Sequence, residues 1–178
     1  MFKGTSASAG IGIGKAVIVE EAELVITRNE VADAEAEIQR FKGALEKTIA
    51  ATQKMADDLA SRVGEKEAEI MQGHMMLLSD PMLTGEIENS VKNDKVNCEF
   101  AIENVCNMYA DMFASMGDEL MQQRATDMRD IKVRMQRTLM GLESVDVSLL
   151  PKGSILVAKD LTPSMTAGIN PENVSGIV

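Results

Sequence analysis

Residues 31–64 read VADAEAEIQRFKGALEKTIAATQKMADDLASRVG. Apolar and small residues recur in this stretch in steps of three and four, which places them along one face of a helix. These residues are Ile38, Phe41, Leu45, Ile49, Thr52, Ala56, Leu59 and Val63. Gly43 interrupts the pattern at modest cost, and Gly64 is placed to end the helix. The stretch therefore predicts one long amphipathic helix.

Four further helical segments follow, and they extend the prediction to a bundle over about residues 31–142. We expect them at about 65–79, 82–92, from 97 onward and 119–140. Asp80-Pro81 separates the second helix from the third, because the residue before a proline avoids the α region and Pro81 suits a first helical turn. Gly141 follows the last helix, where glycine is a common terminator.

The two ends of the chain have a different pattern from the middle. Residues 2–19 are rich in glycine and small residues and end in a β-branched run at 16–19, which predicts short strands there. Residues 154–158 and 174–178 predict two further strands, and residues 165–168 predict a short helix. The fold class is therefore α+β and mostly α, with a helical bundle inserted into a small α/β domain. We expect residues 1–22 and 143–178 to form the α/β part and residues 23–142 to form the bundle.

Composition excludes several classes of function. The net charge is −10, which favours a basic protein partner or simply reflects solvated helices, and it disfavours nucleic acid and anionic lipid. Four Phe, one Tyr and no Trp leave little for stacking on bases. No apolar run approaches the roughly 20 residues that span a bilayer, and the first ten residues show no secretory signal. Cys98 and Cys106 are expected to be reduced core residues, so we expect a cytoplasmic protein.

Two features could carry chemistry, and each has a simpler interpretation. Gly10, Gly12 and Gly14 alternate with isoleucine, but a strand-like run follows them where a dinucleotide loop needs a helix. A kinked or bulged strand is favoured. His74 is the only histidine, and it stands among apolar residues, so a packed or interface role is favoured over phosphoryl acceptance. No Ser–His–Asp set is recognisable, so the chain by itself shows no catalytic constellation.

Residues 65–90 combine six acidic side chains and one basic side chain with seven methionines and leucines. The helix over 65–79 is too apolar to bury all of these on one face, so two alternatives stay open. One is a thick core helix, and the other is an acid-rimmed apolar strip that docks a basic partner. Residues 124–131 carry four charges on one helix, with Arg124 and Asp127 at i, i+3 spacing. Surface ion pairs of this kind contribute little stability.

Four segments together resemble Enzyme I, the phosphoenolpyruvate–protein phosphotransferase family of the bacterial sugar phosphotransferase system. Residues 4–15 resemble the family opening G-x-x-A-S-x-G-I-x-x-G-K. Residues 67–80 resemble E-A-x-x-x-G-H-x-M-L-L-x-D, with one more residue between Glu67-Ala68 and Gly73-His74. Residues 124–131 resemble R-A-x-D-x-R-D-I, and residues 156–164 resemble V-A-x-D-L-T-P-S. The four segments occur in the family order and span nearly the whole chain.

The resemblance implies a transferase that moves phosphate from phosphoenolpyruvate, through a histidine, to a small histidine-containing phosphocarrier protein. It implies that the bundle docks the carrier and that the α/β part is a phosphohistidine-type domain, truncated here. The phosphoenolpyruvate and Mg²⁺ sites and the homodimer interface belong to a barrel in the family's back half, so no cofactor is expected in this part.

The acceptor histidine of the family lies in a G-G-x-x-S-H motif, shortly after a strand that resembles residues 175–178. This sequence does not contain the motif. The resemblance therefore implies that the acceptor lies beyond Val178, and that no residue of this chain is itself catalytic.

The resemblance also implies roles for individual residues. Thr166 matches a threonine beside the absent acceptor histidine, and His74 matches a residue of the docking helix. The expected carrier-contacting residues are Glu65, Glu67, His74, Met76, Leu77, Leu83, Arg124 and Arg129. Two other classes stay possible: a helical binding module without chemistry, and a domain of a pyruvate phosphate dikinase relative.

Overall fold

The structure, a computed structural model, describes residue 5, residues 8–142 and residues 145–178. The chain forms, in order, β1 (Lys15–Val19), α1 (Ala34–Arg62), α2 (Glu65–Leu78), α3 (Pro81–Asp94), α4 (Cys98–Ser115), α5 (Glu119–Met140), a 3-10 turn η1 (Val147–Leu149), β2 (Ser154–Ala158), α6 (Pro163–Gly168) and β3 (Val174–Ile177). Parts of two predictions lie outside the described residues: the start of the N-terminal segment expected to form strands, and the domain boundary expected at residue 143.

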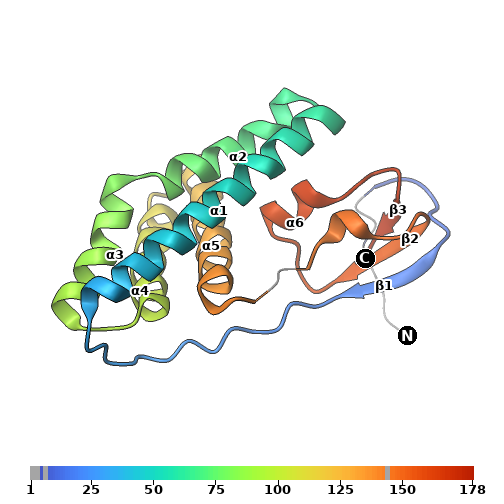
Figure 1. The fold of residues 1–178 in the computed structure, drawn as a ribbon. Coiled ribbons are helices and arrows are strands. Elements are labelled where there is room, and N and C mark those ends of the chain that lie inside the picture. Colours follow the sequence, from blue (N-terminus) through green and yellow to red (C-terminus); the bar gives the residue numbers. More distant parts are fainter. Residues whose placement is uncertain (1–4, 6–7, 143–144) are drawn as a thin grey trace.

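The bundle consists of α1 to α5, with α1 and α2 lying side by side along one flank (Figure 1). The Asp33 carboxylate caps α1 by accepting a hydrogen bond of 3.0 Å from the Ala36 amide. Along α1 the predicted apolar face turns inward, and Ile38 and Phe41 are fully buried. Val63 is an exception, since α1 ends at Arg62 and leaves Val63 exposed. Gly64 has a φ of 139° and begins the next helix.

The largest hydrophobic core lies inside this bundle and joins α1, the end of α2, α3, α4 and α5. Cys98 and Cys106 belong to it as free, buried thiols, as the sequence predicts. Burial raises the pKa of each thiol to about 12, so neither is a reactive thiolate at neutral pH. None of the described helices combines the length and the hydropathy that crossing a bilayer requires.

Among the described residues, three parallel strands form one sheet in the order β1-β2-β3. Lys15 of β1 pairs with Ser154 of β2, although the whole bundle separates them in the sequence. The chain therefore leaves the sheet after β1, builds the bundle and returns at β2, which the extended segment between β1 and α1 makes visible in Figure 1. The predicted fold class is confirmed: the protein is mostly helical with a small parallel sheet. The division into two folding units at the stated residues stays a prediction.

The last strand is one residue shorter than the sequence predicts. β3 ends at Ile177, so Val178 follows the strand and does not belong to it. Val178 nevertheless continues the hydrogen bonding with β2. Its amide donates to the Leu156 carbonyl oxygen at 2.8 Å, and its carbonyl oxygen accepts from the Ala158 amide at 3.0 Å. These bonds hold the backbone of Val178 against the sheet while its side chain stays 75% exposed.

The glycines before β1 have a packing role. A Cβ added at Gly12 would collide with the carbonyl oxygen of Ser175, and one at Gly14 would collide with that of Gly153. The segment thus passes against the backbone beside β2 and β3, where only glycine fits. Its described residues before Lys15 are not in a strand, so the short strands predicted over residues 2–19 reduce to β1. A strand follows the glycines, as the sequence indicates, and the loop-then-helix context of a dinucleotide site is missing there.

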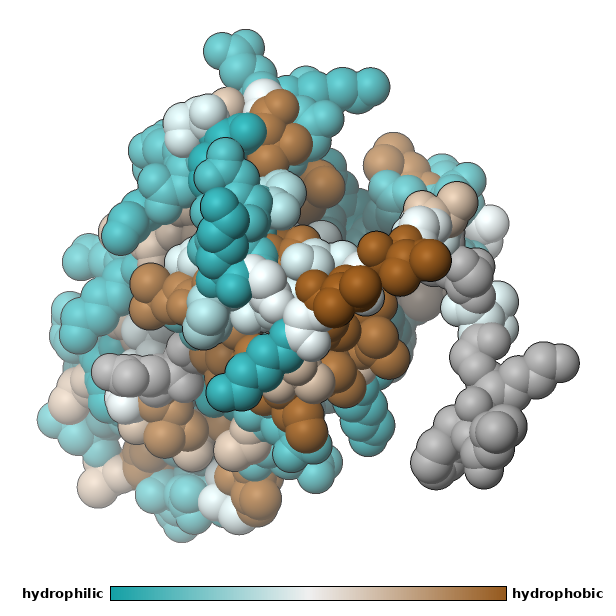
Figure 2. Space-filling model, turned by 90° about the vertical axis from the view of Figure 1, so that its right-hand side faces the viewer, coloured by the Kyte–Doolittle hydropathy of each residue, from teal (hydrophilic) through white to brown (hydrophobic). Residues whose placement is uncertain are grey.

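A junction joins the sheet part to the bundle through α6, which contacts α1, α2 and α5. Two guanidinium nitrogens of Arg62 donate to the carbonyl oxygens of Ile169 and Ala167, at 3.1 and 3.0 Å. The sheet has its own small core of Val19, Val147, Leu150 and Leu156. Its outer side stays apolar, since Ile18 and Ile177 are exposed. Figure 2, which looks onto the sheet end, shows hydrophobic residues gathered near the middle of that view.

Candidate functional site

The candidate site is the solvent-facing side of α2 together with Arg124 of α5, which we call the α2 face. Met76 is 72% exposed and Ile70 is 54% exposed, although both are large apolar residues. Glu65 and Glu67 are exposed in the first turn of α2, where the helix dipole favours negative charge. Leu77 is half-buried against the bundle core. The face is therefore an apolar patch that begins at an acidic helix end.

Arg124 reaches this face from α5 because α2 has a glycine at the point of contact. A Cβ at Gly73 would lie 2.5 Å from the Arg124 Nη1 atom, so a side chain there would displace the guanidinium. The Arg124 Nη1 atom also lies 3.6 Å from Asp127 Oδ2, which confirms that the i, i+3 neighbours form an ion pair. The guanidinium is 34% exposed and so remains available to an anionic group of a partner.

His74 lies on the opposite side of α2, in the interior. Its side chain is 0% exposed, and its Nε2 atom lies 3.2 Å from Asp127 Oδ1. Its Nδ1 atom lies 3.7 Å from Asp130 Oδ2. His74 is therefore packed in the interior, which is one of the roles that the sequence favours for it. Its side chain is buried in this structure, and its contact with a docked partner stays a prediction.

Leu83 also belongs to the interior. Its side chain is 1% exposed and packs into the bundle core. The Asp80 carboxylate caps α3 at the Met82 amide, at 2.8 Å, and this start turns Leu83 inward and its neighbour Met82 outward. Met82 is 67% exposed. Met82 therefore presents an apolar side chain to solvent at the start of α3, and the placement of Leu83 on the contacting surface stays a prediction.

Arg129 and Thr166 are both exposed, as their expected roles require. Thr166 lies on α6, and its Oγ1 donates to the Thr162 carbonyl oxygen at 3.0 Å. Because α6 contacts α2, the threonine lies on an element that adjoins α2. Arg129 lies on α5, within the bundle, and only Thr166 lies on the short helix that joins the sheet part to the bundle. The roles expected for both residues stay predictions. The acceptor histidine expected beyond Val178 lies outside the described residues and stays a prediction.

Asp130 connects α5 to α6 and was not singled out from the sequence. Its side chain is 3% exposed, and its two carboxylate oxygens accept hydrogen bonds from the Ser164 amide at 2.9 Å and the Ser164 hydroxyl at 2.8 Å. Two motifs contain these residues, Arg129-Asp130-Ile131 and Leu161-Thr162-Pro163-Ser164. The presence of both motifs was the signal in the sequence that could have suggested this contact. Asp130 and Ser164 are 34 residues apart, so no local pattern reveals that they touch.

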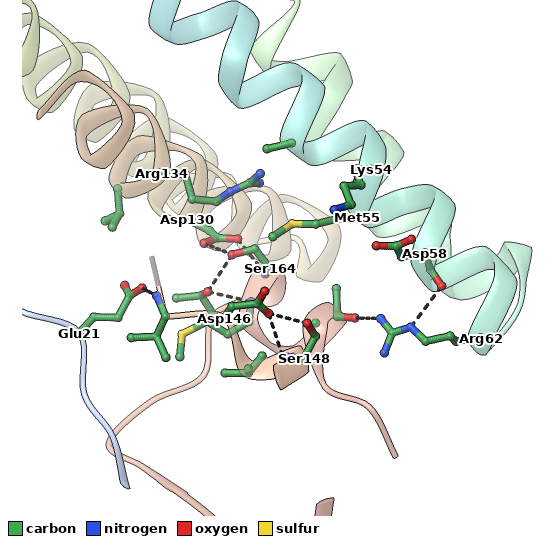
Figure 3. A pocket seen from close by; sticks show the side chains of 18 residues that line it. Glu21, Lys54, Met55, Asp58, Arg62, Asp130, Arg134, Asp146, Ser148 and Ser164 are labelled. Carbon is green, nitrogen blue, oxygen red and sulfur yellow. Dashed lines mark hydrogen bonds between the residues drawn. The ribbon is translucent and has the colours of Figure 1, made fainter. Parts of the chain in front are cut away.

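A cavity of about 330 Å³ lies at the same junction, between α1, α5, η1 and α6 (Figure 3). Its acidic groups hold the backbone in place: Asp130 binds Ser164, and Asp146 accepts from the Ser148 amide and hydroxyl at 2.9 and 2.6 Å. The Arg134 guanidinium donates to Thr52 Oγ1 at 2.6 Å, and burial lowers its pKa. The described residues contain no cluster of three or more His, Cys, Asp or Glu suited to a metal. The cavity lies where the bundle meets the sheet part.

Comparisons with known proteins give a consistent result. Residues 3–124 match the family model "PEP-utilising enzyme, N-terminal". The chain is 40% identical over 177 residues to the phosphoenolpyruvate-protein phosphotransferase of Listeria monocytogenes, which covers 99% of this chain and 31% of that protein. It is 38% identical over 175 residues to the Bacillus subtilis protein of the same name, covering 98% of this chain and 31% of that protein.

A solved structure agrees with the sequence relatives. The solution structure of an Enzyme I protein called nEIt superposes with a TM-score of 0.89 at 36% identity, over 99% of this chain and 72% of that chain. The chain spans 31% of the length of the two curated relatives, and the matched family describes an N-terminal part. The resemblance to the N-terminal part of Enzyme I is thereby confirmed. The chain belongs to the family of PEP-utilising enzymes, as their N-terminal domain.

Proposed function

We propose that this chain is the carrier-docking part of a phosphoenolpyruvate–protein phosphotransferase. In that role it binds the histidine-containing phosphocarrier protein through the α2 face. The observation that carries the proposal is the exposed Met76 on α2, together with the acids in the first turn of that helix and Arg124 beside Gly73. An apolar centre supplies affinity, and acids around it speed the approach of a basic partner.

The net charge of −10 supports the same partner chemistry. Charges that ring an apolar patch change the association rate more than the lifetime of the complex. A carrier that must bind, exchange phosphate and leave needs fast association together with modest affinity. The α2 face, with few apolar residues at its centre, fits such a transient contact.

Phosphate acceptance is assigned to a histidine that these 178 residues do not contain. His74 is the only histidine present, and it is buried between Asp127 and Asp130, where phosphorylation would bring a dianion next to two carboxylates. We propose that the acceptor lies beyond Val178 and near Thr166, whose exposed side chain lies on α6 beside α2. The short path between docking helix and α6 suits a transfer that depends on alignment of two histidines.

The family resemblance supports the remaining parts of the proposal. The relatives are named phosphoenolpyruvate-protein phosphotransferases, so phosphoenolpyruvate is proposed as the phosphate donor. We place its site, a Mg²⁺ ion and a homodimer interface in a barrel outside these residues. The proposed setting is sugar uptake, with the protein acting in the cytoplasm.

Titration calorimetry with purified phosphocarrier tests the docking surface. Met76→Lys should weaken binding tenfold or more, because a buried charge at an apolar contact readily costs the roughly 1.4 kcal/mol that this factor represents. Met108→Lys is the matched control, since Met108 is 53% exposed on α4, and it should bind as the unmodified chain does. Equal affinity of both variants would place the interface away from α2.

A further inference from the structure

A continuous line of polar side chains crosses the bundle from the α2 face to α6. It begins at Arg124, whose guanidinium lies over Gly73, and it passes to Asp127 at 3.6 Å. Asp127 contacts His74 at 3.2 Å, and His74 faces Asp130 at 3.7 Å. Buried polar groups are normally satisfied within their own layer or by solvent, so a line through three helices calls for an explanation.

The inner end of this line is tightly bound. Asp130 holds both the amide and the hydroxyl of Ser164 at 2.9 and 2.8 Å, in a buried setting. Ser164 lies in the first turn of α6 and also contacts the capping hydroxyl of Thr162 at 3.1 Å. Thr166 follows two residues later. Asp130 therefore holds the first turn of α6, while Arg62 holds its end.

The weak link is the contact between His74 and Asp130. The buried Nδ1 atom of His74 has no hydrogen-bond partner among the described residues, and it lies 3.7 Å from the Asp130 oxygen. That distance is about 0.5 Å beyond the usual limit for a hydrogen bond. A small shift of α2 toward α5 would bring the two groups into bonding distance, so the contact can differ between free and docked states.

We infer that Asp130 is a positioning residue that receives a displacement of α2 through His74 and passes it to α6 through Ser164. Docking on the α2 face would act on the line at Arg124, which pairs with Asp127, and through the backbone of α2, which carries both Met76 and His74. The element that carries Thr166 then adjusts when a partner arrives. The inference rests on the proposed function, since it assumes that the phosphocarrier docks on the α2 face.

Amide spectra of the 178-residue chain, titrated with phosphocarrier, test this inference. Signals of Met76 and Leu77 report docking, and signals of Ser164 and Thr166 report α6. In the unmodified chain both groups should shift with the same dissociation constant. In Ser164→Ala the α2 signals should shift with that same constant, while the shift of the Thr166 signal should fall by at least half, because the hydroxyl contact to Asp130 is lost.

Ser148→Ala is the matched control, since Ser148 binds the Asp146 carboxylate through the same two atoms but lies outside the line. It should keep the full Thr166 shift. Asp130→Asn gives a second variant of nearly unchanged shape, and it should reduce the shift as Ser164→Ala does.

The possible outcomes distinguish the proposed docking on the α2 face from the inferred transmission of a displacement to α6. A chain that shows no shift anywhere lacks the proposed docking, and this inference falls with it. Shifts at α2 without shifts at Thr166 overturn the inference alone. A Thr166 shift that stays complete in Ser164→Ala and Asp130→Asn overturns it too, because α6 would then sense the carrier by direct contact.

Discussion

The helical bundle and the sheet differ in how completely each buries its apolar residues. The bundle encloses a core that draws on all five of its helices, with Ile38, Met128 and Ile131 each at most 1% exposed. The sheet encloses four buried residues and leaves Ile18 69% exposed. Stability in a small layer scales with the apolar area it removes from water. The bundle is therefore held by its own core, whereas the sheet depends on the junction at α6.

Because of this difference, we expect the bundle and the junction at α6 to have different roles. The α2 face lies on the well-packed part, which holds its side chains in place for docking and lets α2 shift only as a unit. The short α6 sits between the two regions and is held by Arg62 and Asp130. An element with few apolar contacts of its own is the one that responds to small displacements.

The largest expected contrast compares two isoleucines, one from each region. Ile102→Ala in the bundle should lower the free energy of unfolding by about 2–5 kcal/mol, because the side chain is 0% exposed and leaves a cavity. Ile18→Ala in the sheet should change it by less than about 0.5 kcal/mol, since that side chain is mostly in water. Urea unfolding followed by circular dichroism measures both. Similar losses would mean that the sheet contributes equally to the cooperative core.

An effect of intermediate size is expected when the N-terminal caps of two helices, one in each region, are removed. Asp118 accepts from the Leu120 amide at 2.8 Å at the start of α5, and Asp118→Ala should cost about 1 kcal/mol of global stability. Thr162 caps α6 through the Met165 amide at 3.3 Å. Thr162→Ala should raise hydrogen exchange in α6 with little effect on exchange in α5. If both variants loosen both helices equally, the two regions unfold as one unit.

The smallest expected effect is on the pH dependence of the protein's stability. The Arg40 guanidinium, bonded to Glu37 at 2.6 Å, lowers the pKa of that carboxyl below its usual value. A carboxyl with a lowered folded-state pKa stabilises the protein above its unfolded value of 4.5, and this contribution is lost as the pH falls through the folded value. Glu37→Gln should therefore flatten the loss of stability below pH 4.5. The total effect should stay below about 1 kcal/mol, since Arg40 is 39% exposed.

Arg40→Met should flatten the same part of the pH profile at least as much, because Arg40 also pairs with Glu99 at 2.8 Å. The double variant should differ little from Arg40→Met, because that variant has already lost the interaction between Glu37 and Arg40. Additive effects in thermal unfolding between about pH 3 and 6 would show that the pair acts independently.

Most of the fold could be predicted from the sequence, because it rests on local patterns. The bounds of α5 and β2 agree with the apolar spacing and with the β-branched run, and Gly141 ends α5 in the left-handed conformation with φ 66°. The orientation of individual side chains was harder to predict. Leu83 and Met82 are adjacent and both apolar, and only the capped start of α3 decides which one turns inward.

The candidate site was predictable only in part, for a related reason. A motif gives residue types, and it does not say which of them face solvent: Met76 does and His74 does not. The contact of Asp130 with Ser164 joins two helices far apart in the chain and depends on how α6 packs on the bundle. Long-range contacts of this kind follow from tertiary packing and leave no local spacing to detect.

The most direct test of the account mixes this chain with phosphocarrier carrying labelled phosphate, with calorimetry of the unlabelled pair alongside. The account assigns docking to the bundle and phosphate acceptance to a histidine outside these 178 residues. It predicts that the two proteins bind and that no label passes to this chain, because its one histidine is buried between two carboxylates. Stable label on His74, or the absence of any binding, would contradict it.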